Sequence, residues 1–157
     1  MGDCISLELR YQSLRSSSYS VTSPKTPNYN CVAWAAGEDH RPWWPIPYDT
    51  APYYWPLGEQ EDESLEVFIA CFRSLGYEMC DDDSLEQGFE KVAIYVDEED
   101  DMPSHMARQL KSGWWTSKCG NLQDITHQTL SALEGGQDYG YGKVTCIMKR
   151  KRSVETV

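Results

Sequence analysis

A cysteine at a predicted helix start and a distant histidine are the candidate nucleophile and base of this chain. Cys31 follows Asn30 and opens a run of small residues that favours a helix, whereas His105 lies in a β-type segment. If the fold brings the two together, the helix N-terminus and an imidazolium would lower the pKa of the thiol and yield a thiolate. The expected chemistry is attack on an amide or isopeptide carbonyl, by a protease, an amidase or a deamidase. If they do not meet, Cys31 is a small core residue.

The imidazole of His105 needs a partner that fixes its tautomer. A hairpin turn at 111–113 would bring His105 close to three polar side chains of the following segment. We rank Asp124 first because its carboxylate stabilises an imidazolium, Asn121 second and Ser117 third.

Aromatic side chains near Cys31 are the candidate substrate contacts. The candidate substrate-binding residues are Asn30, Trp34, Trp43 and Trp44. Asn30 would also add a donor to an oxyanion site formed by the helix N-terminus. The proline-rich segment 38–58 that carries Trp43 and Trp44 is expected to cover the core, with some residues lining the cleft. The alternative function is a non-catalytic protein-interaction domain that uses the aromatic 43–55 loop, with Cys31 buried.

Composition limits the function classes. The 157 residues fit one domain with a sizeable core, and the net charge of -11 argues against nucleic-acid binding. No apolar run is long enough to span a membrane, and the first residues do not resemble an export signal. The six cysteines lack metal-type spacing and are expected to be reduced thiols. We therefore expect a cytoplasmic protein that acts on a peptide or protein, without metal or cofactor.

The elements that would position these residues follow from periodicity and turn signals. An irregular arm is expected at 1–27, with a short strand near 5–11, followed by one α+β domain at 28–150 and a basic tail at 151–157. Helices are predicted at 28–37 and 64–76, strands at 91–96, 105–110, 114–119 and 140–148, and a short helical piece around 129–133. This order predicts helices on one face of a largely antiparallel sheet.

Several segments together resemble a known domain family. They are 28–37 (NYNCVAWAAG), 64–78, 88–95 (GFEKVAIY), 103–110 (PSHMARQL), 115–120, 124–127 and 141–144. The chain is similar to a bacterial domain family of unknown function that is associated with the papain-like, NlpC/P60-type cysteine peptidases. The resemblance implies a papain-like α+β fold, in which a Cys-bearing helix and a second helix pack on a mostly antiparallel sheet of about four or five strands. It also implies that Cys31, His105 and Asp124 are the catalytic residues.

Overall fold

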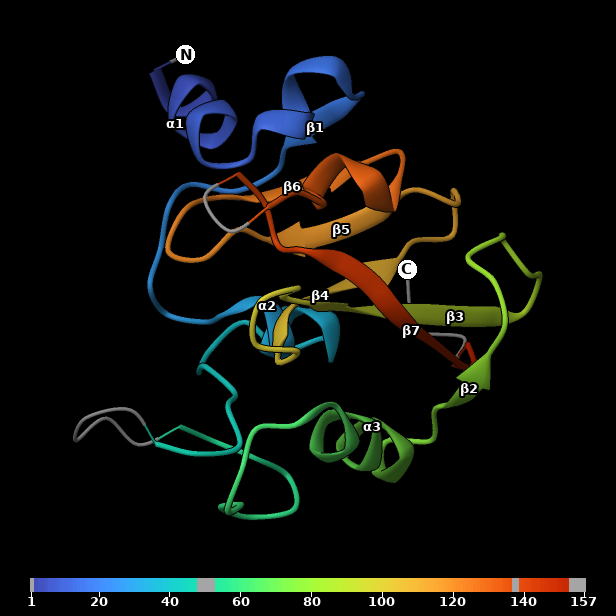
Figure 1. Ribbon diagram of the computed structural model, residues 1–157. Coiled ribbons are helices and arrows are strands. Elements are labelled where there is room, and N and C mark those ends of the chain that lie inside the picture. Colours follow the sequence, from blue (N-terminus) through green and yellow to red (C-terminus); the bar gives the residue numbers. More distant parts are fainter. Residues whose placement is uncertain (1, 48–52, 137–138, 153–157) are drawn as a thin grey trace.

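An antiparallel sheet of seven strands forms the centre of the computed structural model, which describes residues 2–47, 53–136 and 139–152 (Figure 1). The strands are β1 (Tyr19–Val21), β2 (Glu78–Cys80), β3 (Phe89–Val96), β4 (Pro103–Gln109), β5 (Trp115–Lys118), β6 (Asp124–His127) and β7 (Lys143–Lys151). Their order across the sheet is β1-β6-β5-β4-β3-β7-β2, and each neighbouring pair is antiparallel. The long strands β3 and β7 therefore lie toward one edge, and the short β1 forms the other.

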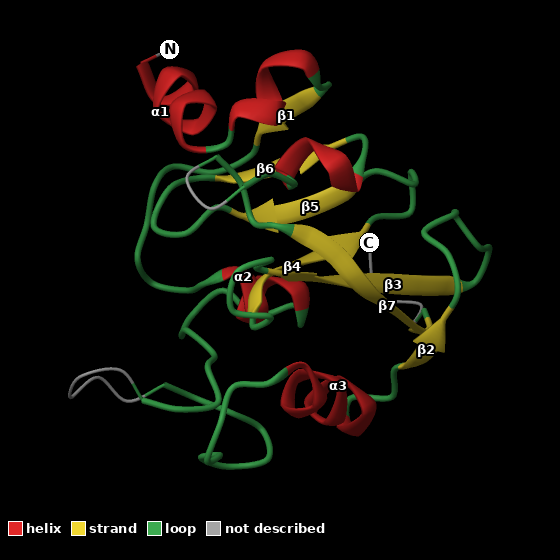
Figure 2. Ribbon diagram, viewed as in Figure 1, coloured by secondary structure: helices red, strands yellow, loops and turns green. Residues whose placement is uncertain are grey.

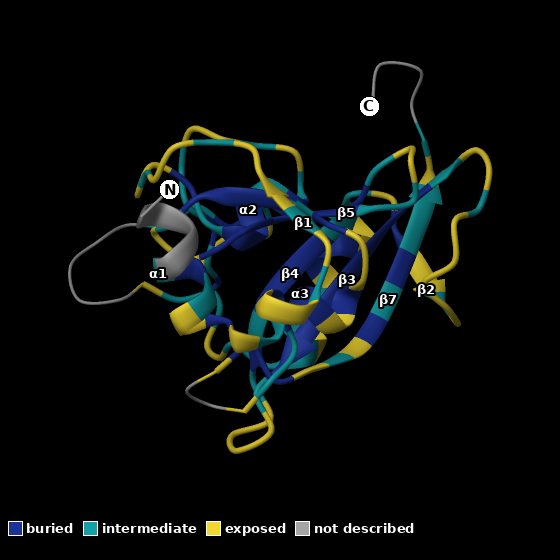
Figure 3. Ribbon diagram, turned by 90° about the horizontal axis from the view of Figure 1, so that it is seen from above, coloured by how far each residue is buried: buried dark blue, intermediate teal, exposed yellow. Residues whose placement is uncertain are grey.

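Side-chain alternation along the central strands divides the buried residues into two cores. On β3, Val92 and Ile94 belong to a first core, whereas Ala93 and Tyr95 belong to a second. On β4, Met106 lies in the first core and Ala107 in the second. The sheet is thus buried on both faces, as the dark colouring of β3 and β4 in Figure 3 shows.

Short helices cover both faces of the sheet (Figure 2). The first core is closed by α2 (Cys31–Ala35), α3 (Leu65–Ser74) and the aromatic segment between them. The second core is closed by α1 (Gly2–Arg10) and by two 3-10 helices, η1 (Gln12–Ser16) and η2 (Leu130–Leu133). Leu7, Tyr11 and Leu14, within the predicted N-terminal arm, therefore help to complete the second core.

Helix α3 confirms the helix predicted at 64–76. Phe68 and Phe72 lie four residues apart, so both point into the first core. Ser64 occupies the N-cap position with extended backbone, and Gly76 follows the helix with a φ of 98°. Glycine adopts this left-handed conformation without the cost that a Cβ would add, so the helix ends where the sequence indicates.

The predicted papain-like fold with four or five strands is wrong. The sheet has seven strands, and helices pack on both of its faces, whereas the prediction had them on one. The strand predicted near 5–11 is wrong, because residues up to Arg10 belong to helix α1. Leu7 of α1, Tyr11 and Leu14 of η1 follow one another at spacings of four and three residues and pack into the second core. Of the predicted basic tail, Lys151 ends β7, and residues 153–157 lie outside the described residues.

Candidate functional site

The helix start at Cys31 is built as the sequence predicts. The Asn30 side chain caps α2, since its Oδ1 accepts a hydrogen bond from the Ala33 N–H at 3.1 Å. The same oxygen accepts from the Trp43 N–H at 3.0 Å, and Asn30 Nδ2 donates to the Trp43 carbonyl at 2.7 Å. Asn30 therefore ties the helix to the aromatic segment, and its amide is committed to this structural role.

The Cys31 thiol is buried, with 8% of the residue exposed. Burial raises its pKa to about 11, although the Met106 backbone N–H and the charge of Lys118 act in the opposite direction. The cost of desolvating a thiolate here is larger than the stabilisation by these contacts, so the sulfur is a neutral thiol at neutral pH.

His105 lies on β4 and is 1% exposed. Its ring stacks on Tyr141 with centroids 4.0 Å apart and an interplanar angle of 10°, and it meets the edge of Tyr95 at 5.1 Å. Neither ring nitrogen has a hydrogen-bond partner among the described residues. Desolvation, together with the nearby His127, holds the pKa of His105 well below its usual range, so the ring is neutral.

The structure does not join Cys31 and His105 by a hydrogen bond within the described residues. Strand alternation explains this, because Cys31 packs with Met106 in the first core, while the neighbouring His105 contacts two tyrosines of the second. The β4–β5 pairing ends at Arg108 and Thr116, so the ladder does not extend to His105. The thiol–imidazole hydrogen bond on which the hydrolase prediction depends is absent from this geometry.

Asp124 anchors the N-terminal arm and does not orient His105. Its carboxylate accepts hydrogen bonds from the Tyr29 hydroxyl at 2.6 Å and from the Thr22 hydroxyl. Its backbone N–H donates to the Ser23 hydroxyl at 2.9 Å. These bonds hold the segment before α2 against strand β6. They also satisfy the buried carboxylate, whose burial without hydrogen bonds would cost free energy.

Ser117, the third-ranked partner, contacts a different histidine. Its hydroxyl lies 2.8 Å from His127 Nε2, and His127 Nδ1 lies 2.8 Å from the Thr129 carbonyl. A carbonyl only accepts, so Nδ1 carries the proton and the Ser117 hydroxyl donates to Nε2. Both residues are completely buried, and burial lowers the pKa of His127 to about 4. No sequence signal distinguished this serine–histidine pair from the other polar residues of β5 and β6.

A surface pocket of about 480 Å³ opens beside the start of α2. Its lining residues are Pro27, Tyr29, Asn30, Pro42, Trp44, Tyr53 and Asn121. None of them is charged. Two contacts fix the orientation of the Trp44 indole: its Nε1 donates to Glu63 Oε2 at 3.1 Å, and its ring packs edge-on against Phe68 with centroids 5.3 Å apart. A pre-formed aromatic concavity of this size is typical of ligand sites.

The four predicted substrate-binding residues thus have different fates. Asn30 and Trp44 line the pocket, whereas Trp43 is buried in the first core with 3% exposed. Trp34 lies against the sheet, where its Nε1 donates to the Thr116 hydroxyl at 2.9 Å. Asn121, considered as a partner of His105, lies instead on the rim of this pocket. Residues 48–52 of the predicted aromatic loop lie outside the described residues.

Within ranges 2–47, 53–136 and 139–152, no group of three or more His, Cys, Asp or Glu side chains is arranged to hold a metal ion. None of the helices described is long and apolar enough to cross a bilayer.

Comparison with known proteins places the chain in a family. The model of a family described as "Domain of unknown function (DUF7689)" matches residues 20–149. The chain belongs to this family. No curated protein and no solved structure matches the chain. The DUF7689 region contains strands β2–β6, most of β1 and β7, both Cys31 and His105, and the pocket beside α2.

Alkylation rates distinguish a buried thiol from an activated one in this DUF7689 protein. We expect iodoacetamide at neutral pH to modify Cys80, which is partly exposed, faster than Cys31 and Cys71, which are buried. Time-resolved peptide mass spectrometry gives the rate for each cysteine. Cys71 is the matched control, because it is a buried thiol with no proposed role. Modification of Cys31 ahead of Cys80, lost in a His105→Ala variant, would contradict this geometry and favour a cysteine hydrolase.

Proposed function

We propose that this protein is a non-catalytic interaction domain whose pocket beside α2 binds an uncharged, proline-containing peptide segment. The observation that carries the proposal is the lining of the pocket, which consists of aromatic, proline and asparagine side chains without a charged group. Flat aromatic rings provide contact area at a low cost in conformational entropy, and proline-rich ligands fit such surfaces because their extended conformation is already formed.

The polar groups at the pocket suit the backbone of an extended peptide. A polyproline-type ligand has no internal hydrogen bonds, so its carbonyl groups need donors. Asn121 is exposed at the rim, and its amide can donate to such a carbonyl. The hydroxyl of Tyr29 already donates to Asp124, which fixes the orientation of its ring at the pocket.

The condition of the thiol favours binding over hydrolysis. The predicted cysteine hydrolase requires a thiolate and an imidazole that can accept its proton. Burial raises the pKa of Cys31, and His105 is enclosed between aromatic rings without a partner for either nitrogen. The pocket, in contrast, is open to solvent at the surface.

The test is a titration of the isotopically labelled protein with an acetylated, amidated proline-rich peptide, followed by the NMR signals of the Trp44 indole N–H and the Asn121 amide. We expect saturable shifts at both, and Tyr53→Ser should weaken binding by about tenfold, because loss of one buried aromatic contact costs about 1.4 kcal/mol. Tyr139→Ser is the control, since Tyr139 is an exposed tyrosine that does not line the pocket.

Three binding results would overturn the proposal. They are the absence of saturable shifts, equal binding of a peptide with alanine in place of each proline, and equal weakening by Tyr53→Ser and Tyr139→Ser. Cleavage of the peptide that is lost in Cys31→Ser would also overturn it and would support the hydrolase prediction.

A further inference from the structure

The side chain of Lys118, the last residue of β5, is completely buried. Its Nζ donates to three backbone carbonyls, those of Thr26 at 2.7 Å, Gly120 at 2.8 Å and Leu122 at 2.6 Å. Three donated hydrogen bonds use all three hydrogens of an ammonium group, so the group is charged and its donors are satisfied. Removal of the ammonium would leave these carbonyls without that donor.

The bonded carbonyls belong to the walls of the uncharged pocket beside α2. They are carbonyls of the residue before Pro27 and of the two residues that flank Asn121. Pro27 and Asn121 both line the pocket. A third lining residue, Tyr29, has its ring centroid 5.2 Å from Lys118 Nζ. One buried group thus joins two wall segments that lie far apart in the sequence.

Asp124 holds one of these segments from the neighbouring strand. Lys118 and Asp124 lie opposite each other in the pairing of β5 with β6. The Asp124 carboxylate accepts hydrogen bonds from the hydroxyls of Thr22 and Tyr29. Segment 22–29 is therefore bound by a buried carboxylate through its hydroxyls and by a buried ammonium through a carbonyl. Such buried charges can define a single conformation of the segment that they bind.

The bond between Lys118 and the Gly120 carbonyl determines the direction of the Asn121 N–H. The Gly120–Asn121 peptide is trans, and the C=O and N–H groups of a trans peptide point in opposite directions. The Asn121 N–H therefore points away from the buried ammonium. Neither this N–H nor the Asn121 side-chain amide bonds to a described residue, and Asn121 is exposed at the rim of the pocket. Both groups are thus free to donate to a ligand.

We propose that Lys118 is a positioning residue of the pocket beside α2. Its ammonium fixes the 119–122 turn, so that the backbone N–H and the side-chain amide of Asn121 donate to a backbone carbonyl of the bound peptide. This inference rests on the peptide-binding function proposed for the pocket. A turn that is fixed before the peptide arrives does not have to be ordered on binding, which lowers the entropic cost of the complex.

The test replaces Lys118 by methionine, which keeps the aliphatic stem and removes the charge and its three donors. We expect Lys118→Met to weaken the binding of the proline-rich peptide by about tenfold, because the released turn must then be ordered on binding. In NMR spectra of this variant without peptide, the backbone and side-chain N–H signals of Asn121 should already be shifted or broadened. In the parent protein, peptide binding should move the Asn121 N–H proton signal downfield, as a new hydrogen bond does.

Lys91→Met is the matched control. Lys91 is also a buried lysine, with 1% exposed, and its Nζ donates to the carbonyl and to the carboxylate of Asp82, both at 3.1 Å. Neither Lys91 nor Asp82 lines the pocket beside α2. Each variant loses the hydrogen bonds of one buried ammonium, so the melting temperature of both should fall. Only Lys118→Met should change the peptide affinity and the Asn121 signals.

A second measurement needs no variant and therefore does not depend on the folding of Lys118→Met. In the isotopically labelled parent protein, scalar couplings through hydrogen bonds should connect Lys118 Nζ with the carbonyl carbons of Thr26, Gly120 and Leu122. Peptide binding should shift the ammonium signal of Lys118, whose partners flank Asn121, and should leave that of Lys91 unchanged.

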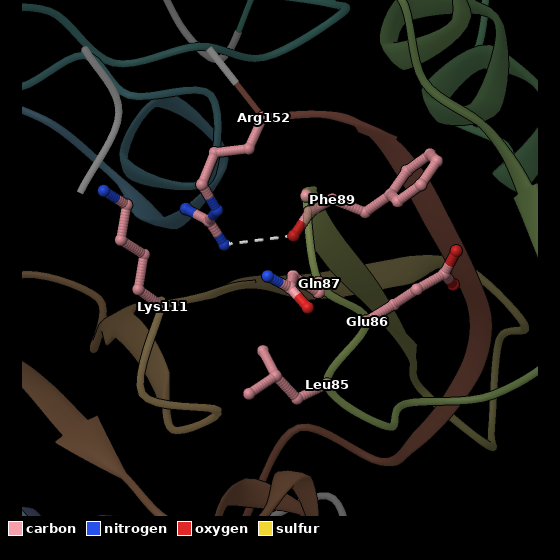
Figure 4. Close-up of a pocket in the computed structure, with 7 residues that line it drawn as sticks. Leu85, Glu86, Gln87, Phe89, Lys111 and Arg152 are labelled. Carbon is pink, nitrogen blue, oxygen red and sulfur yellow. Dashed lines mark hydrogen bonds between the residues drawn. The ribbon is translucent and has the colours of Figure 1, made fainter. Parts of the chain in front are cut away.

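The groove at the start of β3 is the internal reference for these titrations (Figure 4). It holds about 620 Å³ and shares no lining residue with the pocket beside α2. Unlike that pocket, it has Lys111 and Arg152 among its lining residues. The backbone signal of Gly88, which lines this groove, should stay unchanged when the proline-rich peptide binds.

The contrary results separate the role of Lys118 from the function of the pocket. No saturable binding by the parent protein, or a shift of Gly88 in place of Asn121, would overturn both. If the parent protein binds the peptide at the pocket, three results would overturn the role of Lys118 alone. They are equal affinities of Lys118→Met and Lys91→Met, unchanged Asn121 signals in free Lys118→Met, and the absence of the Nζ couplings.

Discussion

Replacing Gly142 by alanine destabilises the fold by an expected 3–5 kcal/mol, that is, about 1–2 for the left-handed backbone and the rest for steric overlap. Gly142 has a φ of 84°, and an added Cβ would overlap the Val96 carbonyl oxygen and lie 2.9 Å from its carbon. The Gly142 N–H and carbonyl also form reciprocal hydrogen bonds with Gly135, at 2.8 and 3.0 Å, so the backbone cannot move aside without losing them. Urea unfolding, followed by circular dichroism, measures the loss.

Gly37→Ala is the control for this prediction. Gly37 also has a positive φ, of 92°, but an added Cβ there would meet nothing within 4 Å. Its substitution is expected to cost only the backbone part, about 1–2 kcal/mol. If the two variants lost the same free energy of unfolding, the close approach of Gly142 to β3 would not contribute to the cost of the substitution, and the prediction would be wrong.

Replacing His105 by phenylalanine is expected to stabilise the protein by about 1–2 kcal/mol near neutral pH. Phenylalanine keeps an aromatic ring against Tyr141 and removes two buried nitrogens that have no partner among the described residues. A buried polar atom without a hydrogen bond costs free energy, so an apolar ring of similar shape recovers it. Destabilisation by this substitution would indicate that the imidazole makes a polar interaction.

The same variant should also resist acid better than the parent protein. The pKa of His105 is lowered in the folded state, mainly by desolvation, whereas in the unfolded chain it is about 6.5. Below that pH the unfolded chain binds a proton that the folded protein does not, so stability falls as the pH falls. The advantage of His105→Phe should therefore be larger at about pH 5 than at about pH 7.5 in urea unfolding.

His127 provides the matched contrast, because it is equally buried but fully hydrogen-bonded. His127→Phe would leave the Ser117 hydroxyl and the Thr129 carbonyl without their partner. We expect this variant to lose about 1–3 kcal/mol, opposite in sign to His105→Phe. Changes of the same sign in both variants would contradict the difference in hydrogen bonding that the structure shows.

Local patterns in the sequence predicted the individual elements well where one periodicity dominated. Helix α3 and the hydrophobic core of β3 lie where spacing and β-type composition place them. No strand was predicted at the four residues of β6, although the alternation of Ile125 and His127 with their neighbours is typical of a strand. The helical spacing of Leu7, Tyr11 and Leu14 was hidden by the serine-rich stretch that surrounds it.

The candidate site could not be predicted from the same patterns, because it depends on which face of the sheet each side chain occupies. The order of Cys31 and His105 along the chain is compatible with a thiol hydrolase. Neighbouring positions on a strand face opposite sides of the sheet, however, and His105 faces the second core, whereas Cys31 lies in the first. Met106 occupies the position that points toward α2. The pocket beside α2 is formed by segments near residues 27–30, 42–44 and 53 and by Asn121, and only the fold brings these together.

The contribution of α1 and η1 to the second core separates the family region from the folding unit. The family match begins at residue 20, yet Leu7, Tyr11 and Leu14 are buried against Tyr95 and Trp115. The Tyr11 hydroxyl lies 2.6 Å from that of Tyr141, within hydrogen-bonding distance. A fragment cut at the family boundary would lose α1 and η1 and would leave part of the second core uncovered, although η2 would remain on it. In this protein α1 and η1 are therefore part of the folding unit, although they lie outside the family region.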